Sequence, residues 1–510
     1  MLKPREIHMP IGFINKFINV LIISAIVILT YYLSLKFVYP GYFEPLTPHH
    51  EDFYWFYSGS PLINFGDLYK TARPVFFLLA NFVSMLGLKL GIVFMIILTL
   101  INIILTILCV RAISGKISYL MTAIYSTMVF MSPYFYFNYT YMITDTYAYF
   151  FLLLIIYFWY KYKNDLNIPK ILLISLFIFL CFFSKESFFV TVVLFFIFQF
   201  IFEKKLRKYS SSLILISLIG ILLVVIQSRL INGVWVNLGN TSDSPYFVNM
   251  DPGSIISTYL YYIQGIANIY NIVILALSLT ILICTKKYIR ESIMLLACGL
   301  SVYIPYSLIP NHKEIYYLFL GVPLLCAVIL FLSADVFSEF KTKIFNKFKY
   351  NNKYAFLLIA LVFITLTFFK VVNLSKGDDY RPYNYGWYLQ IESSNRNILN
   401  SFEKIKQELS AQNNDNILIL GLDSFNTLYQ SPFSPNGKGV QFIDNYFGNK
   451  NINWTIAFYY NEAPWWIKIN KDIRSRDGNI FHYINISEID PKNYKMVITY
   501  DQNGKLVNKE

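Results

Sequence analysis

The chain has 510 residues, of which 56% are hydrophobic, and a mean hydropathy of +0.48. A soluble protein of this length cannot bury so much apolar surface, so the composition excludes a soluble enzyme and predicts a polytopic α-helical membrane protein. The net charge of +13 does not indicate a nucleic-acid partner, because residues 376–510 hold 15 basic and 15 acidic residues and the whole excess lies in the apolar part.

Eleven apolar runs predict transmembrane helices. The first, Phe17–Val38, is about 22 residues long and lacks a small-residue cleavage site, so we expect a retained anchor rather than a signal peptide. Two shorter segments predict helices rather than full spans: Pro74–Leu88, at the membrane interface or partly buried, and Ile255–Gln264, at the interface. The other runs fall near residues 91–110, 117–133, 146–160, 170–184, 187–202, 211–230, 262–284, 292–309, 315–336 and 354–374.

The basic residues between these runs predict the orientation. With a cytoplasmic N-terminus, the inside segments hold 20 basic residues and the short outside loops only seven. The positive-inside rule therefore predicts a cell inner membrane protein with its N-terminus in the cytoplasm. The expected organisation is a transmembrane domain over residues 1–375, with an extracytoplasmic first loop at 39–89, followed by a periplasmic or extracellular domain over 376–510.

The hydrophilic tail has the pattern of a small α/β domain. Residues Tyr388–Gln412 have the apolar spacing of a helix. Strand-like runs follow it, separated by turn residues; they are Asn416–Leu420, Val440–Ile443, Trp454–Tyr460 and Met496–Tyr500.

An acidic pair, Glu51–Asp52, lies in the first predicted outside loop between Pro48 and a run of aromatic residues. A carboxylate flanked by apolar rings at a membrane surface experiences a low dielectric constant, which favours a general base. The alternative is a solvated loop pair. His50 could join these acids around a divalent metal, although His49 beside it would point the other way in an extended segment. The sequence requires no cofactor.

Other polar residues belong to the same predicted face. Asp145 begins the fourth span, where it is either a second acid of the site or a helix-capping residue. Lys185 and Glu186 form the turn between the fifth and sixth spans, where they are either functional or a local ion pair.

Besides Lys185, three basic side chains on this face are candidates for binding phosphate. Arg73, just before Pro74, suits a bidentate contact with phosphate or serves as an interfacial anchor. His312 and Lys313, between the ninth and tenth spans, could neutralise a phosphate leaving group, although a lone loop histidine is more often inert.

Together these features resemble the GT-C superfamily, membrane glycosyltransferases that use polyprenyl-phosphate sugars. The topology resembles that family over nearly the whole apolar part, including O-antigen glucosyltransferase and mannosyltransferase types. The local motifs similar to the family are Glu51–Asp52, Ala72-Arg73-Pro74, Asp145, Ser184-Lys185-Glu186-Ser187, and His312 followed by Tyr316-Tyr317 and Gly321-Val322-Pro323.

The resemblance implies an inverting transfer of a hexose from a polyprenyl-phosphate donor to a glycan, lipid or protein acceptor. It implies that Asp52, with Glu51 as the other candidate, removes the proton from the acceptor hydroxyl. Asp145 or Glu186 would orient the acceptor or a basic partner, with His50 in a supporting role. The donor phosphate would be stabilised by Arg73, Lys185, His312 and Lys313.

Three alternatives remain. An O-antigen polymerase or ligase also acts on lipid-linked sugars, but it is expected to use a large loop between spans. A lipid-linked oligosaccharide flippase or other transporter predicts ionisable residues near the bilayer midplane and paired broken helices. A non-catalytic membrane assembly protein is the third alternative.

Overall fold

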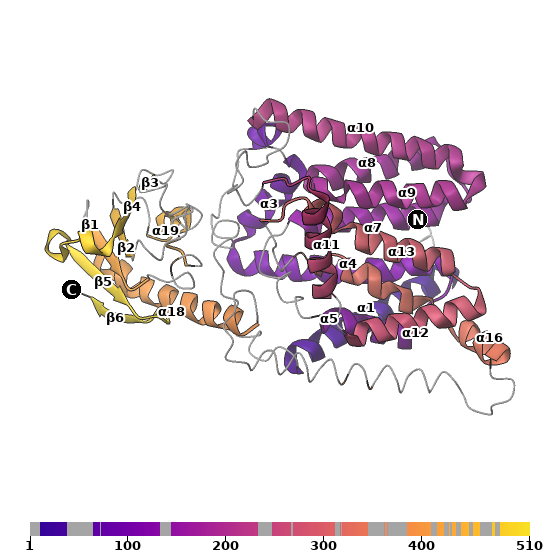
Figure 1. The fold of residues 1–510 in the computed structure, drawn as a ribbon. Helices are drawn as coiled ribbons and strands as arrows, with labels where there is room; N and C mark the ends of the chain where they lie inside the picture. Colours follow the sequence, from indigo (N-terminus) through magenta and orange to yellow (C-terminus); the bar gives the residue numbers. More distant parts are fainter. Residues whose placement is uncertain are drawn as a thin grey trace, which may run out of the picture. The chain divides into compact units, whose positions relative to one another are not determined.

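The computed structural model (Figure 1) describes most of the apolar part and much of the tail. The described residues are 11–37, 65–71, 73–132, 144–232, 247–266, 269–311, 317, 319–344, 362, 365, 385–409, 416–422, 428, 431–434, 440–447, 452–458, 472–474, 480–509.

The chain divides into two compact units. Unit 1 falls within Met1–Pro40, Leu98–Phe135 and Asp145–Val372, and unit 2 within Gly41–Ile97, Tyr136–Thr144 and Asn373–Glu510. The predicted division near residue 375 lies close to the last of these boundaries, and its functional meaning stays a prediction.

The secondary-structure elements of unit 1, in the residues that the structure describes, are helices. Its helices are α1 (Ile11–Phe37), α4 (Leu88–Ser114, which enters the unit at Leu98), α5 (Tyr119–Phe130), α7 (Thr144–Tyr162), α8 (Ile168–Ser184), η2 (Glu186–Phe188), α9 (Phe189–Phe202), η3 (Lys204–Leu206), α10 (Arg207–Asn232), α11 (Pro252–Ile266), α12 (Ile269–Thr285), α13 (Ile289–Ser301), α14 (Ile304–Ser307), α15 (Val322–Cys326), η5 (Ala327–Phe331) and α16 (Ala334–Ile344).

Three of the described helical stretches are long and apolar enough to cross a membrane, which supports membrane association. They are Phe17–Lys36, Leu90–Ser114 and Lys204–Ile231. A fourth span would be the pair Val322–Phe331 and Ala334–Phe340, which is bent by 66°. Five further apolar helices are shorter. The expected total of eleven spans and their orientation therefore stay predictions.

Proline explains where the late helices depart from the predicted straight runs. The run predicted at 292–309 is divided, because α13 ends at Ser301 and the short α14 begins again just before Pro305. The run predicted at 315–336 contains the short α15, with Pro323 in its first turn, and then η5. Proline is compatible with the first turn of a helix but not with its interior, so each one marks a new start.

Two glycines allow α13 and the segment before α15 to approach closely. A Cβ atom on Gly321 would lie 2.4 Å from the carbonyl oxygen of Gly299 and 2.6 Å from the hydroxyl of Tyr303. The Gly321 amide instead donates a hydrogen bond of 2.8 Å to that hydroxyl. No larger residue fits this contact without a backbone shift.

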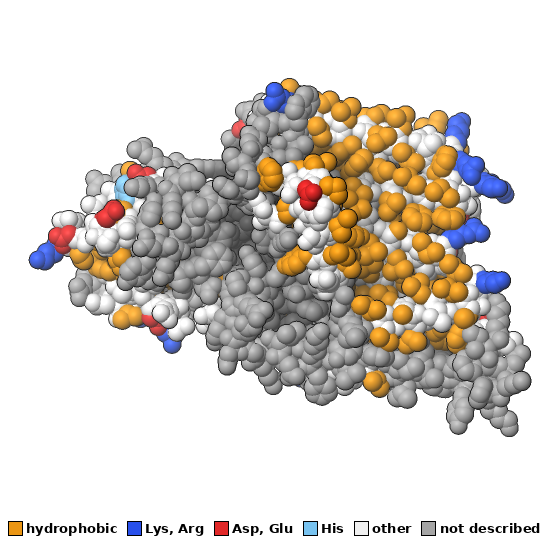
Figure 2. Space-filling model, in the orientation of Figure 1, with side chains coloured by type: hydrophobic (Ala, Val, Ile, Leu, Met, Phe, Trp, Pro, Cys, Tyr) orange, Lys and Arg blue, Asp and Glu red, His pale blue; other side chains and the backbone are white. Residues whose placement is uncertain are grey.

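The basic turns of unit 1 gather at one end of its helices. Arg290 lies over the ring of Phe202, at 5.9 Å from the centroid, and the hydroxyl of Tyr288 donates to the carbonyl of Ser114 at 3.2 Å. These contacts bring the turns after α4, α9 and α12 together. Figure 2 shows Lys and Arg side chains at this end of a broad hydrophobic face, to which α10 contributes Leu215, Leu218, Ile219, Leu222 and Leu223.

Unit 2 contains a six-stranded sheet in the order β3-β4-β2-β1-β5-β6. The four central strands are parallel and the two edge strands are antiparallel to their neighbours. The strands are β1 (Asn416–Leu420), β2 (Asn453–Phe458), β3 (Asp472–Arg474), β4 (Ile480–Asn485), β5 (Met496–Tyr500) and β6 (Leu506–Lys509). The predicted small α/β domain is confirmed in this respect; its extracytoplasmic location stays a prediction.

The helices of unit 2 are η1 (Phe65–Lys70), α3 (Pro74–Leu86), α18 (Tyr385–Leu409) and α19 (Val440–Phe447), with two short turns, η8 (Ile486–Glu488) and η9 (Pro491–Asn493). The expected helices at Pro74–Leu88 and Tyr388–Gln412 are confirmed within a few residues; an interfacial position of α3 stays a prediction. The expected strand at Val440–Ile443 is wrong, because these residues begin α19. Phe442 and Phe447 of that helix both pack on Phe402 of α18 in the buried core of the tail.

Candidate functional site

Asp145 is a buried carboxylate in the first turn of α7, with only 1% of its surface exposed. The N-terminus of a helix carries a partial positive charge, which stabilises a carboxylate there. This location explains how an acidic residue is tolerated in an otherwise apolar bundle, and burial requires that its oxygens have partners.

Lys185 provides one partner because the chain breaks its helix at that residue. Helix α8 ends at Ser184, Lys185 is extended (φ −156°, ψ 113°), and the short turn η2 begins at Glu186. The Lys185 side chain is buried, and its Nζ lies 3.8 Å from Oδ2 of Asp145. Two charges that the sequence separates by 40 residues therefore form a buried ion pair.

Tyr306 of α14 provides the partner for the other carboxylate oxygen. Its hydroxyl donates a hydrogen bond to Oδ1 of Asp145. The same hydroxyl lies 3.0 Å from Oγ of Ser187. Because the phenolic hydrogen points to the carboxylate, the Ser187 hydroxyl donates to the phenolic oxygen. Three elements, α7, η2 and α14, are thus joined around one carboxylate.

Aromatic rings cover the lysine side of this cluster. Tyr317 stacks on Tyr306 with ring centroids 3.9 Å apart and an interplanar angle of 26°. The Nζ of Lys185 lies 5.8 Å from the Tyr306 centroid and 6.0 Å from the Tyr317 centroid. An ammonium this close to two ring faces gains cation–π attraction. We call Asp145, Lys185, Ser187, Tyr306 and Tyr317 the Asp145 cluster.

Neighbouring contacts fix the helices that carry the cluster. The side-chain amide of Asn102 donates to the carbonyl of Thr146 at 3.1 Å, which ties α4 to the start of α7. Tyr262 of α11 stacks on Tyr303 with centroids 5.7 Å apart and contacts the ring of Tyr306 at 6.4 Å. These contacts hold α4, α7, α11 and α14 together around Asp145 and Tyr306.

The structure brings together two of the residues that the sequence proposed, Asp145 and Lys185. Glu186 follows Lys185 and is half-buried at the start of η2. Arg73 belongs to unit 2, where it precedes Pro74 at the start of α3. The other candidates lie outside the described residues: Glu51, Asp52, His50, His312 and Lys313.

Sequence reasoning gave no role to Tyr306 and named Ser187 and Tyr317 only as parts of motifs. Tyrosine is too common to stand out, since the chain has 42. The one available signal was Pro305, which interrupts an apolar run and begins a new turn that carries Tyr306.

Metal binding stays untested as a prediction. Within the part of the chain that the structure describes, no three His, Cys, Asp or Glu side chains gather closely enough to hold a metal ion. The acidic and histidine residues of the first loop are outside that part.

Comparison with protein-family models finds no match, and comparison with curated proteins finds none either. The chemistry of the Asp145 cluster must therefore be argued from its own atoms. A buried ion pair with a phenol on the second carboxylate oxygen has its polar groups partnered. This arrangement can hold the ammonium group of Lys185 in place beside the tyrosine rings, and that ammonium would attract an anionic group of a ligand.

Proposed function

We propose that the chain is an inverting glycosyltransferase of the GT-C type. It would move a hexose from a polyprenyl-phosphate donor to a glycan, lipid or protein acceptor at the outer face of the cytoplasmic membrane. The acceptor oxygen attacks the anomeric carbon, the bond from that carbon to the phosphate oxygen breaks, and the phosphate leaves with the electron pair.

The observation that carries this proposal is the buried Lys185 ammonium beside two tyrosine rings, held by a carboxylate on another helix. A leaving phosphate needs a fixed positive charge, because charge that is already in place stabilises the transition state without reorganisation. Aromatic side chains beside it suit the apolar faces of a sugar ring or the first units of a prenyl chain.

The geometry favours a positioning role for Asp145 over the role of general base. A base must have an oxygen available for the incoming proton. Both oxygens of Asp145 face donors, the phenol of Tyr306 on one and the ammonium of Lys185 on the other. The base in this proposal is therefore Asp52, as the sequence predicts, and Asp145 fixes the lysine that faces the phosphate.

The test is transfer of a labelled hexose from polyprenyl phosphate in purified membranes, at matched expression of each variant. We expect Asp52→Asn to lower transfer by about 10²–10⁴-fold, the usual contribution of a positioned base. We expect Lys185→Met to lower it by about 10²–10³-fold, as for loss of one group that stabilises developing negative charge.

Lys170→Met is the matched control, because Lys170 also pairs with an aspartate, Asp165, but is in the first turn of α8, at the opposite end of that helix from Lys185. Transfer by this variant should remain at the wild-type rate. Full transfer by both Asp52→Asn and Lys185→Met would reject the assigned roles.

One observation bears on the transporter alternative. If the pair of helices bent by 66° forms one span, it is a broken span of the kind that transporters use, although transporters pair two such spans in related halves. Movement of a lipid-linked sugar across a reconstituted bilayer, without transfer to any acceptor, would favour that alternative over the glycosyltransferase.

A further inference from the structure

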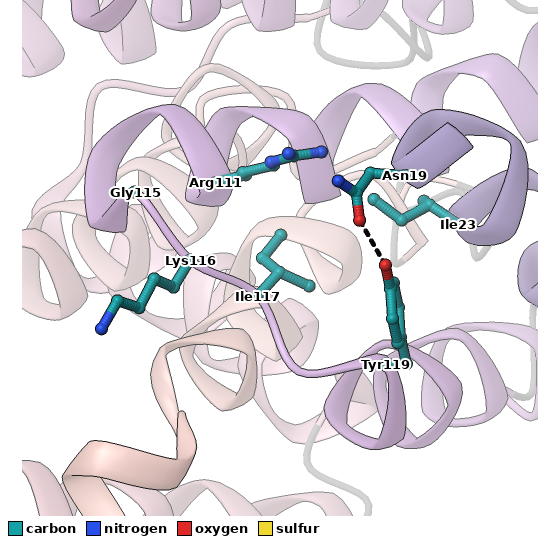
Figure 3. Close-up of a pocket in the computed structure, with 7 residues that line it drawn as sticks. All are labelled: Asn19, Ile23, Arg111, Gly115, Lys116, Ile117 and Tyr119. Atoms are coloured by element: carbon teal, nitrogen blue, oxygen red, sulfur yellow. Dashed lines mark hydrogen bonds between the residues drawn. The ribbon is translucent and has the colours of Figure 1, made fainter. Parts of the chain in front are cut away.

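A pocket of about 310 Å³ lies at the basic end of unit 1. Figure 3 shows its lining, which comes from α1, from the last turn of α4, and from the turn that leads into α5: Asn19, Ile23, Arg111, Gly115, Lys116, Ile117 and Tyr119. Its volume is at the low end for small-molecule sites, which are roughly 300–1,000 Å³, so it suits one small group rather than an oligosaccharide.

The polar groups at this pocket are mostly hydrogen-bond donors. The hydroxyl of Tyr119 donates to Oδ1 of Asn19. This bond uses the acceptor end of the amide and turns its NH₂ end toward the guanidinium of Arg111, as Figure 3 shows. Two donor groups that face each other across a cavity attract an acceptor with several oxygens, above all an anion.

Arg111 is the side chain that distinguishes this pocket from a neutral cavity. It is half-buried, and the described residues give its guanidinium neither an ion pair nor a hydrogen bond. Lys116 differs, because its ammonium points away from the pocket in Figure 3 and lies 4.0 Å from Asp335. The carbonyl oxygen of Arg111 accepts from the amide of Gly115 at 2.8 Å, so the nearby helix end is already capped.

The depth of the pocket along the spans indicates a lipid rather than a soluble ligand. Asn19 is in the first turn of the apolar stretch Phe17–Lys36, and Arg111 is in the last turn of α4. Both positions correspond to the level of phospholipid headgroups when these helices cross a bilayer. Ile18, Leu21 and Ile22 are exposed on α1 beside Asn19, where acyl chains would contact them.

We propose that this pocket binds the phosphate of an anionic phospholipid, with the guanidinium of Arg111 and the amide of Asn19 as donors to its oxygens. The inference is independent of the proposed glycosyltransferase activity and of the Asp145 cluster. If the orientation predicted from the basic turns is correct, the lipid belongs to the cytoplasmic leaflet, where anionic lipids attract basic residues.

The test uses the full-length protein in nanodiscs of phosphatidylcholine with a minor fraction of phosphatidylglycerol, and native mass spectrometry to count retained lipids. We expect wild type to retain phosphatidylglycerol over phosphatidylcholine, and Arg111→Gln to lose at least about tenfold of that preference, since a charge-assisted hydrogen bond is removed. Arg290→Gln, which removes an exposed arginine in the first turn of α13 at the same end of the unit, should retain it.

Two further measurements separate the alternatives. Tyr119→Phe keeps every charge and removes only the hydroxyl that donates to Asn19, so it should weaken retention less than Arg111→Gln does. Glycerol 3-phosphate and inorganic phosphate should not displace the lipid; displacement by either would identify a soluble phosphate as the ligand and overturn the lipid assignment. Equal loss in Arg111→Gln and Arg290→Gln would overturn the pocket itself and leave only general attraction to basic turns.

Discussion

Two of the lysine–carboxylate ion pairs in unit 1 have an importance for stability that does not follow from their N–O distances. Lys287 and Glu339 are 2.6 Å apart, with 36% and 30% of their side chains exposed. Lys185 and Asp145 are 3.8 Å apart, with 11% and 1% exposed. The shorter pair is in contact with solvent, and the longer pair is enclosed by aromatic rings.

The shorter N–O distance suggests that the Lys287–Glu339 pair is the more important for stability, but burial makes disruption of the Lys185–Asp145 pair the more costly. A solvent-exposed pair contributes only ~0–1 kcal/mol, because water and salt screen it. A buried pair also contributes little net stability when intact, because both charges have lost their hydration. Removal of one partner is costly, however, since it leaves the other charge buried without compensation. The enclosed pair is therefore the one whose disruption affects folding, and its retention needs a reason other than stability.

The largest expected effect is that of breaking the buried pair. Lys185→Met should destabilise the protein by about 3–5 kcal/mol, because it leaves the carboxylate of Asp145 buried without the positive charge that pairs with it. The measurement is the thermal unfolding midpoint of the purified protein in detergent, which should fall well below that of Lys170→Met.

The double variant Asp145→Asn with Lys185→Met separates folding from function. It removes both charges, so stability should partly recover while hexose transfer does not. If the double variant lost as much stability as the two single variants lose together, the ion pair would not be the source of the effect.

The second effect concerns the phenol that completes the cluster. Tyr306→Phe should cost about 1.5–3 kcal/mol, because Asp145 loses a hydrogen bond to a charged group inside the bundle. Tyr160→Phe is the matched control: its hydroxyl is also buried but accepts from the neutral amide of Gln199 at 2.9 Å. The comparison is between unfolding midpoints, and equal shifts would show that the carboxylate gives Tyr306 no special importance.

The sequence predicted the charged half of this cluster and not the aromatic half. Charges are rare in apolar helices, so Asp145 and Lys185 stood out, and alternation of spans assigned them to one face. Tyr306 and Tyr317 meet only because the chain breaks near Pro305, and the path of a broken helix depends on packing that no local pattern encodes.

In the tail, too, the sequence predicted some secondary-structure elements and missed others. Of the four interior strands, β1, β2 and β5 were predicted because buried parallel strands are continuous apolar runs, whereas β4 was missed because it is only partly buried and contains His482 and Asn485. The edge strands β3 and β6 are three and four residues long and carry polar residues, so they gave no signal. Residues Val440–Ile443 have a strand-like composition, but they form a helix that packs Phe442 on Phe402 of α18, so tertiary packing overrides the local propensity.

A third prediction tests the frame that holds the cluster rather than its charges. Gly321→Ala should cost about 1–3 kcal/mol through overpacking, because the new Cβ would overlap the carbonyl of Gly299 and displace Tyr303. Gly66→Ala is the control, since nothing lies within 4 Å of the place that its new methyl group would occupy. The unfolding midpoint should fall for the first variant and stay near wild type for the second.

The smallest expected effect is at the exposed Lys287–Glu339 pair, whose contribution to stability depends on pH and on salt. The hydrogen bond from Lys287 to Glu339 raises the pKa of the lysine above its ordinary value. A raised folded-state pKa means that the pair stabilises fully below the unfolded pKa of ~10.4 and that this contribution is lost as pH rises through the folded value. Lys287→Met should therefore cost only ~0.2–1 kcal/mol at pH 7, and less in high salt. Unfolding midpoints in low and high salt test this, and a loss as large as that of Lys185→Met would contradict burial as the factor that separates the two pairs.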